Sequence, residues 1–358
     1  MNLFNLRSSS KLLFISMFSI LLIGIWAITP ATAHCGGNHT GNHPHCSGGG
    51  GTPNAEIIYL KPSSSIMVAN ADGSNQSTAL SDSSISYIFT HPSWTSDGNG
   101  FLFAADFAGA GIYFQAFNNT TGFADGDPQL LTTVTETNLA APKMSPGPSV
   151  DGNVKIVFAD QQGNGTSDLF LMNSDGSNVT RLTPLDGASD VSPRWSPYSD
   201  QIVVLAYDSA SNQSIQVIDL VLNSGTGQIE EGGRTNLTVA GVLSTLYVHS
   251  PVWSPDGGSV MVSAADSSNF DDLYLIPVAN PALATNITNT SNIDEKDAIF
   301  SPDGTQILHR VYSPSDPCPG GKGKKSFHGL ALRNADGSPI GSCEIERIIS
   351  SGFSPDWR

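Results

Sequence analysis

A short phrase, most complete as "WSPDG" at residues 253–257 and "FSPDG" at residues 300–304, recurs along this chain. Aligned on the Asp or its equivalent, its six copies are centred on residues 97, 151, 198, 256, 303 and 356. Successive copies therefore stand 47 to 58 residues apart. A period of about 40–50 residues is typical of the four-stranded blades of a β-propeller. The repeat predicts six such blades.

The sequence between copies has the composition of β-strands. After the copy at residues 194–200 come "QIVVLAYD", "SIQVIDL" and "RTNLTV", and the other intervals repeat this order of two apolar runs and a Thr-rich segment. Such runs, bounded by Gly, Asp and Asn, are typical of strands, and Asp-Gly pairs between them favour tight hairpins. The sequence predicts an all-β fold, a six-bladed propeller of four-stranded antiparallel blades.

The phrase itself indicates a turn at the end of each innermost strand. Pro fixes φ, Asp hydrogen-bonds to its own backbone, and Gly adopts the left-handed conformation. The Trp or Phe that precedes the turn is expected to pack between neighbouring blades.

The two ends of the chain predict how the ring closes. "FSPDW" at residues 353–357 is followed by no further strand in this sequence. "AEIIYL", "SSIMVANADG" and "QSTAL", between residues 55 and 80, look like the second, third and fourth strands of a blade without its first. We expect the C-terminal strand to join these three, because closing the ring removes open sheet edges.

The first 33 residues have the pattern of a secretory signal. Arg7 and Lys11 precede the apolar run "LLFISMFSILLIGIWAI", and "ATA" at residues 31–33 is a typical cleavage site. We expect cleavage before His34; the alternative interpretation is a retained membrane anchor. Residues 34–53 then form a flexible leader rich in His, Cys and Gly, and residues 54–358 form the propeller. No later segment resembles a membrane span, so we expect a secreted or periplasmic protein.

The charge of the chain excludes two classes of partner. It has 16 Lys and Arg against 32 Asp and Glu, a net charge of −16, which becomes −18 once Arg7 and Lys11 are removed. Nucleic acids and anionic lipids bind to basic patches. We therefore expect neither of them as a partner.

Export would permit disulfides, and the four cysteines fall into two local pairs. We expect Cys35–Cys46 and Cys318–Cys343, although four cysteines allow three pairings. The leader also carries four histidines that could chelate copper or zinc, namely His34, His39, His43 and His45. The alternative is a flexible leader pinned by a disulfide, which would remove both thiolates from the ligand set.

The repeat resembles that of a known family. "DLFLMNSDGSNVTRLT" at residues 168–183, followed by "SPRWSP" at residues 192–197, is similar to the repeat of the TolB-type, WD40-like β-propellers. "SPVWSPDG" and "IFSPDG" match that repeat as well, and the resemblance covers nearly all of the chain after Pro53. TolB is a periplasmic partner in the Tol–Pal envelope system, so the resemblance implies protein binding outside the cytoplasm. An α/β domain precedes the propeller in TolB, and we expect that domain to be absent here.

A second group of proteins carries a similar propeller. Peptidases of the prolyl oligopeptidase type join it to an α/β-hydrolase domain, but this sequence contains no Gly-x-Ser-x-Gly nucleophile elbow. The repeat therefore indicates a fold rather than a hydrolase activity.

Polar residues just before each phrase are candidates for a site at the mouth of the central channel. These residues are His91, Lys143, Asp190, Arg194, His249 and Asp297. Mixed charges that converge on one mouth could bind a polar ligand or a peptide. The alternative is that they are solvated channel lining or partners for the turn backbone.

These observations predict a non-catalytic protein-binding or scaffold module, monomeric, whose partner is a protein or an envelope component. The alternative from another class is a metal-assisted oligouronide lyase that uses His91 or His249, because some propeller lyases place histidines and a metal similarly. A third possibility is metal binding by the leader alone.

Overall fold

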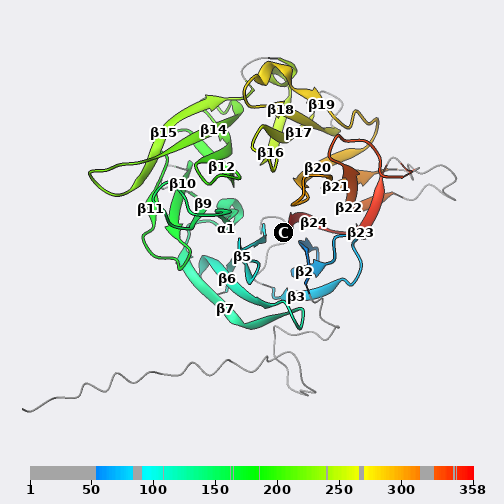
Figure 1. Ribbon diagram of the computed structural model, residues 1–358, viewed down its shortest axis with the longest axis horizontal. Helices are drawn as coiled ribbons and strands as arrows, with labels where there is room; N and C mark the ends of the chain where they lie inside the picture. The colour runs from blue at the N-terminus through cyan, green and yellow to red at the C-terminus, as the bar shows by residue number, and fades with distance from the viewer. Residues whose placement is uncertain are drawn as a thin grey trace, which may run out of the picture. The chain divides into compact units, whose positions relative to one another are not determined.

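The computed structural model describes residues 54–83, 91–107, 109–161, 163, 165–184, 186–238, 241–265, 270–314, 326–341, 343 and 345–358. These residues belong to one compact unit, Ala33–Arg358. They form six four-stranded antiparallel sheets in a ring, which confirms the expected six-bladed propeller (Figure 1). The expected boundaries after residues 33 and 53 lie outside the described residues and stay predictions.

Each blade has its first strand at the ring axis and its fourth strand at the outer edge of the ring (Figure 1). Blade 1 consists of β24 (Phe353–Trp357), β1 (Ile57–Lys61), β2 (Ser65–Ala69) and β3 (Ser77–Ser81). Blade 2 consists of β4 (Ser93–Trp94), β5 (Gly100–Asp106), β6 (Ala110–Asn118) and β7 (Phe123–Thr133). Blade 3 consists of β8 (Lys143–Met144), β9 (Lys155–Gln161), β10 (Ser167–Asn173) and β11 (Thr180–Arg181).

The second half of the ring repeats this plan. Blade 4 consists of β12 (Ser189–Trp195), β13 (Gln201–Tyr207), β14 (Gln213–Leu222) and β15 (Ile229–Asn236). Blade 5 consists of β16 (Tyr247–Trp253), β17 (Ser259–Ala265), β18 (Asp271–Pro277) and β19 (Thr285–Asn286). Blade 6 consists of β20 (Asp294–Phe300), β21 (Gln306–Ser313), β22 (Phe327–Asn334) and β23 (Glu346–Ser350). Helical turns among the described residues are short: α1 (Thr137–Ala140), η1 (Val242–Thr245) and η2 (Pro281–Leu283).

The second strand of a blade is mostly apolar because neighbouring blades cover both of its faces. In β5, Phe101 and Phe103 pack against blade 1, whereas Leu102 and Ala104 pack against blade 3. Alternation along a strand therefore divides its side chains between two interfaces. In the described part of the chain, apolar clusters of this kind fill all six interfaces between neighbouring blades.

The recurring phrase forms the expected turn. At residues 253–257, Ser254 Oγ donates to Asp256 Oδ1 at 2.6 Å and accepts from the amide of Ser259 at 2.9 Å. Gly257 has a φ of 69°, a conformation that a residue without a Cβ adopts at least cost. The aromatic residue joins blades as expected, since the indole of Trp195 donates to the Lys143 carbonyl of blade 3 at 3.0 Å.

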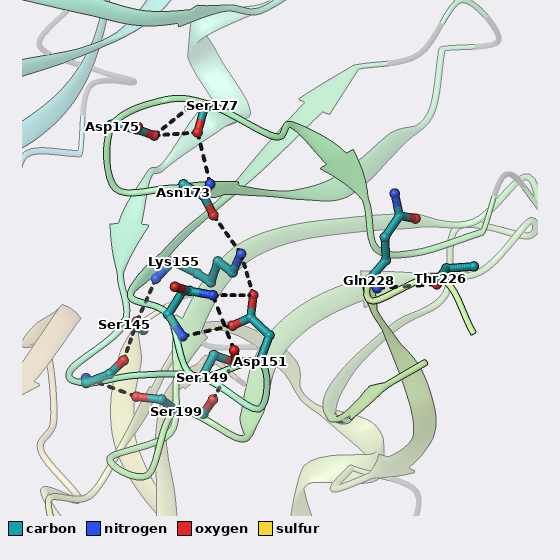
Figure 2. Close-up of polar contacts among 12 residues, drawn as sticks. Ser145, Ser149, Asp151, Lys155, Asn173, Asp175, Ser177, Ser199, Thr226 and Gln228 are labelled. Carbon is teal, nitrogen blue, oxygen red and sulfur yellow. Dashed lines mark hydrogen bonds and ion pairs between the residues drawn. The ribbon is translucent and has the colours of Figure 1, made fainter. Parts of the chain in front are cut away.

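The turns of neighbouring blades also bond to each other (Figure 2). Ser149 Oγ of blade 3 donates to the Ser199 carbonyl of blade 4 at 2.8 Å. Within blade 3, Lys155 Nζ lies 2.7 Å from both Asp151 Oδ2 and Asn173 Oδ1, so it links the two hairpin turns on that side. The Asp and Asn side chains of the repeat are thus used to hold turns together.

The ring closes as expected, with β24 antiparallel to β1. Ile57 lies opposite Trp357 and Leu60 lies opposite Phe353. The first blade therefore contains strands from both ends of the described chain (Figure 1).

Arg358 ties this closing strand to blade 2. Its Nε donates to the Ala55 carbonyl at 2.7 Å, its Nη2 donates to Asn119 Oδ1 at 2.6 Å, and its Nη1 donates to the Gly98 carbonyl. The guanidinium carbon also lies 3.8 Å from the ring centroid of Trp94. One side chain therefore stabilises the junction between two blades through both hydrogen bonds and a cation–π contact.

The sixth copy of the phrase has a different role from the others. Trp357 pairs with Ile57 on β1 in the way that Trp253 pairs with Val260 on β17. Asp356 therefore lies on a strand, and aligning it with the turn aspartates is wrong. The reason is that Trp357, rather than Phe353, occupies the aromatic position of this blade.

Blade 6 buries three ionisable side chains, those of Glu295, His309 and Arg333. Arg333 Nη2 lies 2.5 Å from Glu295 Oε1, and both side chains are almost fully buried. Burial raises the pKa of Glu295 to about 7, against the opposing effect of Arg333. Burial, together with the charge of Arg333, lowers the pKa of His309 to about 3. His309 is therefore neutral in the folded protein at physiological pH.

Replacing His309 with Leu should flatten the dependence of stability on acid pH. The unfolded chain binds a proton at His309 near its usual pKa of 6.5, whereas the folded protein binds it only near 3, so wild-type stability falls as the pH drops below 6.5. The loss from this group is about 2 kcal/mol at pH 5. Urea titrations give the free energy of unfolding at pH 7 and at pH 5. The decrease between these two pH values should be smaller in the variant than in the wild type by this amount. An unchanged difference would contradict a neutral His309.

Candidate functional site

The innermost strands carry a bulge that redirects side chains toward the ring axis. In β16 the register shifts between His249 and Val252, and β12 and β20 show the same shift. Ser250, inside the β16 bulge, has a φ of 51°. The equivalent residues of four other blades are also left-handed, namely Ala141, Ser192, Asp297 and Ser354. Bulges re-aim side chains, and each such non-glycine residue costs about 1–3 kcal/mol of backbone strain.

The residues of these bulges line one cavity at the ring axis, to which all six blades contribute. Its volume, taken as the space that the centre of a water molecule can occupy, is about 30 Å³. This volume suits a few water molecules or one small polar group. The polar lining residues are His91, Lys143, Ser192, Arg194, Ser250, Asp297 and Ser354. Four of the six sequence candidates, His91, Lys143, Arg194 and Asp297, are therefore brought together.

Lys143 is paired inside the cavity. Its Nζ lies 3.1 Å from Asp356 Oδ1, and the other oxygen of Asp356 accepts the amide of Trp94 at 2.8 Å. Burial lowers the pKa of Lys143 to about 8, with Asp356 opposing the shift and Arg194 adding to it. Lys143 and Asp356 thus link blade 3 to blade 1 near the axis.

Asp297 is held on the opposite side of the cavity. Its Oδ1 accepts from Ser250 Oγ at 2.9 Å, and its Oδ2 lies 3.4 Å from Arg310 Nη1. Burial alone would raise the pKa of Asp297, but Arg310 and His91 outweigh it and hold the pKa below its usual value. Burial lowers the pKa of His91 to about 4, so this imidazole is neutral above that pH.

Arg194 lies between these pairs without a carboxylate partner in the described chain. Its Nη1 donates to the carbonyl of Pro193 at 2.9 Å. Burial lowers the pKa of Arg194, whereas Asp356 and Asp297 raise it from beyond ion-pair distance. The guanidinium therefore faces the cavity with most of its donors unused.

The structure places the other two candidates away from the cavity lining. Asp190 accepts two hydrogen bonds from Arg234, at 2.8 and 2.7 Å, and is buried within blade 4. His249 Nε2 lies 2.9 Å from Asp271 Oδ1, and its Nδ1 lies 3.1 Å from Ser250 Oγ. Neither residue is part of the cavity lining, and both are bonded to residues of other strands. A ligand-binding role for all six candidates stays a prediction.

Sequence reasoning missed several residues of the cavity. Ser192, Ser250 and Ser354 stand three places before the aromatic position of their blades, as do His91 and Asp297. Aligning the copies on the aromatic residue, instead of on the turn Asp, would have found this polar column. Asp356 was missed for the same reason.

Aromatic side chains of three adjacent blades, 5, 6 and 1, lie on the face on which the innermost strands begin. Tyr247 begins β16 and is 58% exposed, and Tyr312, beside the start of β20, is 42% exposed. Phe353 begins β24 and packs edge-on against His328, with 4.8 Å between ring centroids. Arg310 stands 5.8 Å from the ring centroid of Phe353. We call Tyr247, Tyr312, His328 and Phe353 the aromatic rim.

Within the described ranges, no group of three or more His, Cys, Asp or Glu side chains is arranged to hold a metal ion. No helix in this same part of the chain has the length and apolarity of a membrane span. His34, His39, His43 and His45 lie outside the described residues, so copper or zinc binding there stays a prediction. Cys343 is disulfide-bonded, but Cys35, Cys46 and Cys318 also lie outside, and both pairings stay predictions.

The fold and the site define a six-bladed propeller with a polar axial cavity and an aromatic rim. No protein-family model and no curated protein matches the sequence. Among solved structures, TolB from Acinetobacter baumannii has 20% identity and a TM-score of 0.58, with 85% of this chain and 66% of that chain covered. A protein assigned as TolB from Agrobacterium tumefaciens has 18% identity and a TM-score of 0.54, with 84% and 91% covered. These likenesses show that the chain shares the propeller fold of TolB.

A third solved structure bears on the lyase alternative. An oligogalacturonate lyase in complex with manganese has 15% identity and a TM-score of 0.45, with 73% of this chain and 72% of that chain covered. This likeness is too distant to support an activity, and the lyase alternative stays a prediction.

Proposed function

We propose that this protein is a non-catalytic binding module that docks another protein on the face that carries the aromatic rim. The observation that carries the proposal is the combination of this rim, on blades 5, 6 and 1, with the polar cavity at the ring axis. Aromatic side chains and Arg are enriched in protein interfaces and supply most of their binding energy. The fold shared with TolB supports the proposal, because that resemblance implies a partner in the cell envelope.

The size of the cavity supports this function over the enclosure of a large ligand. Pockets for small molecules usually occupy about 300–1,000 Å³. The axial cavity, at about 30 Å³, would admit one group of a partner rather than a sugar chain. The remainder of the partner would then lie on the rim.

Selection of a random-peptide display library against the immobilised full chain tests this function. Peptides that bind the wild type should bind Tyr247→Ser and Tyr312→Ser about tenfold or more weakly, because truncating a central interface aromatic costs about 2 kcal/mol. Fluorescence anisotropy with labelled peptides measures the affinities.

Tyr198→Ser is the matched control for this selection. Tyr198 is 68% exposed and follows the end of β12, where its hydroxyl donates to the Asp256 carbonyl at 3.1 Å. It therefore lies on the opposite face from the aromatic rim. Peptides that bind all three variants equally well would show that the rim is not the docking surface, and a library that yields no binder would count against the function.

We also propose that the protein acts outside the cytoplasm, with residues 1–33 removed as a signal and residues 34–53 retained as a leader. The basic start, the apolar run and the small-residue site support this processing. Mass spectrometry of the protein recovered from its native cells should find His34 at the N-terminus. Retention of residues 1–33 would favour the membrane anchor.

A further inference from the structure

Some charged groups of the axial cavity have an ion-pair partner, and one does not. Lys143 is paired with Asp356 at 3.1 Å, and Asp297 is paired with Arg310 at 3.4 Å. Arg194, by contrast, makes no ion pair with any described residue, and one of its five N–H groups donates to Pro193. Arg194 keeps part of its surface exposed, and a cation drawn largely out of water without a carboxylate partner is stabilised when an anion joins it.

The charge balance of the cavity also favours the binding of an anion. Lys143, Arg194 and Arg310 are cationic, Asp297 and Asp356 are anionic, and His91 is neutral because burial holds its pKa near 4. These groups therefore carry an excess of one positive charge at the axis of a chain whose net charge is −16. The nearby Lys296 is paired with Asp271 at 2.8 Å and with Asp294 at 3.1 Å, and these three charged residues, one cation and two carboxylates, are not part of the cavity lining.

We propose that the axial cavity binds a carboxylate group and that Arg194 is its principal ligand. The guanidinium fork matches the two oxygens of a carboxylate better than it matches a single halide ion. The hydroxyl groups of Ser192 and Ser354 line the same cavity and can donate to the bound oxygens. The small volume of the cavity selects a planar carboxylate over a bulkier tetrahedral oxyanion.

The carboxylate can come from two sources. One is a free small acid, and the other is an acidic side chain or a C-terminus of the protein that docks on the aromatic rim. The second source rests on the proposed function, whereas the first does not. The two arms of the experiment separate them.

The first arm measures thermal unfolding of the full chain in sodium formate and in sodium chloride at equal ionic strength. A ligand of the native state raises the unfolding temperature with its concentration. We expect formate to raise the unfolding temperature of the wild type more than chloride does. The affinity of Arg194→Gln for formate should be at least about tenfold weaker, because the charged guanidinium is lost. Arg194→Lys, which keeps the charge but loses the fork, should lie between them and serves if the Gln variant does not fold.

Arg181→Gln is the matched control for this arm. Arg181 is on the outer strand of blade 3, where its Nη2 lies 3.2 Å from Asp168 Oδ2, remote from the axis. The unfolding temperature of the Arg181→Gln variant should respond to formate as that of the wild type does. The carboxylate site is overturned if formate and chloride stabilise the wild type equally, or if Arg194→Gln responds to formate like the wild type.

The second arm uses peptides selected on the aromatic rim, with each acidic side chain changed to its amide and the C-terminus amidated. If the partner supplies the carboxylate, one amide form should bind at least about tenfold more weakly, and formate should compete with the acid form. If the acid and amide forms of the peptides all bind equally well, the partner is not the source of the carboxylate. A formate response without any selected peptide would leave the carboxylate site standing and contradict the proposed function.

Discussion

Removal of residues 353–358 is expected to abolish cooperative folding of this protein. The truncation deletes β24, which is the innermost strand of blade 1, and leaves the edge of β1 unpaired. It also removes the Arg358 contacts that join blade 1 to blade 2. The combined loss should equal or exceed the 5–15 kcal/mol by which a typical domain is stable, so roughly all of the native state would be lost. Circular dichroism during heating, together with size-exclusion chromatography, measures the outcome.

Arg358→Gln provides the control for this truncation. The variant keeps β24 and loses the charged hydrogen bonds and the stacking on Trp94, which should cost about 2–4 kcal/mol and leave the protein folded. A synthetic peptide of residues 350–358, added to the truncated protein, should restore the cooperative transition in proportion to its concentration. A truncated protein that melts like the wild type would mean that the closing strand is dispensable.

The second large effect is expected for Arg333→Leu. This change leaves the Glu295 carboxyl buried in blade 6 without the guanidinium that lies 2.5 Å away. Breaking a buried pair by removing one partner costs about 3–5 kcal/mol, because the remaining charge is uncompensated. The free energy of unfolding, from urea titrations at pH 7, measures this loss. Arg347→Leu is the matched control, since that Arg stacks on Phe327 nearer the surface and should cost about 1 kcal/mol or less.

The deficit of Arg333→Leu should also depend on pH in a defined direction. The folded protein already holds the Glu295 proton up to about pH 7, and loss of Arg333 raises that pKa further. Since the unfolded chain releases this proton near pH 4.5, both proteins should lose stability as the pH rises from there to about 7, and above that pH only the variant should continue to lose it, so the deficit grows with pH. Glu295→Met combined with Arg333→Met should restore most of the stability. A single variant as stable as the wild type at every pH would contradict a compensating pair.

The axial cavity explains why polar residues recur at one place in otherwise apolar strands. The bulge turns the residue three places before the aromatic position toward the axis, where no neighbouring blade covers it. Polar side chains such as Ser192, Ser250 and Asp297 are therefore tolerated at a position that would be core in a regular strand. The bulges of the innermost strands thus form the candidate site.

The sequence by itself determined the number of blades, their strands and the turn at the end of each innermost strand. These features depend on local properties: the alternation of side chains along a strand, the φ of Pro and Gly, and the hydrogen bonds of Asp to its own turn. Ring closure was also predictable, because a missing strand at one end matched a surplus strand at the other. Four of the six candidate residues line the cavity, because the number of residues between each of them and the turn sets its position along the innermost strand.

Only the tertiary structure decided which charged groups meet. Lys143 and Asp356 are 213 residues apart, and their pairing depends on the innermost strands of blades 3 and 1 meeting near the axis. His249 and Asp190 stand one and two places before the left-handed residues of their strands, so the bulge sends them to Asp271 and Arg234 instead of to the cavity. A local pattern cannot report such pairings, because they are set by the rotation at the bulge and by the closure of the whole ring.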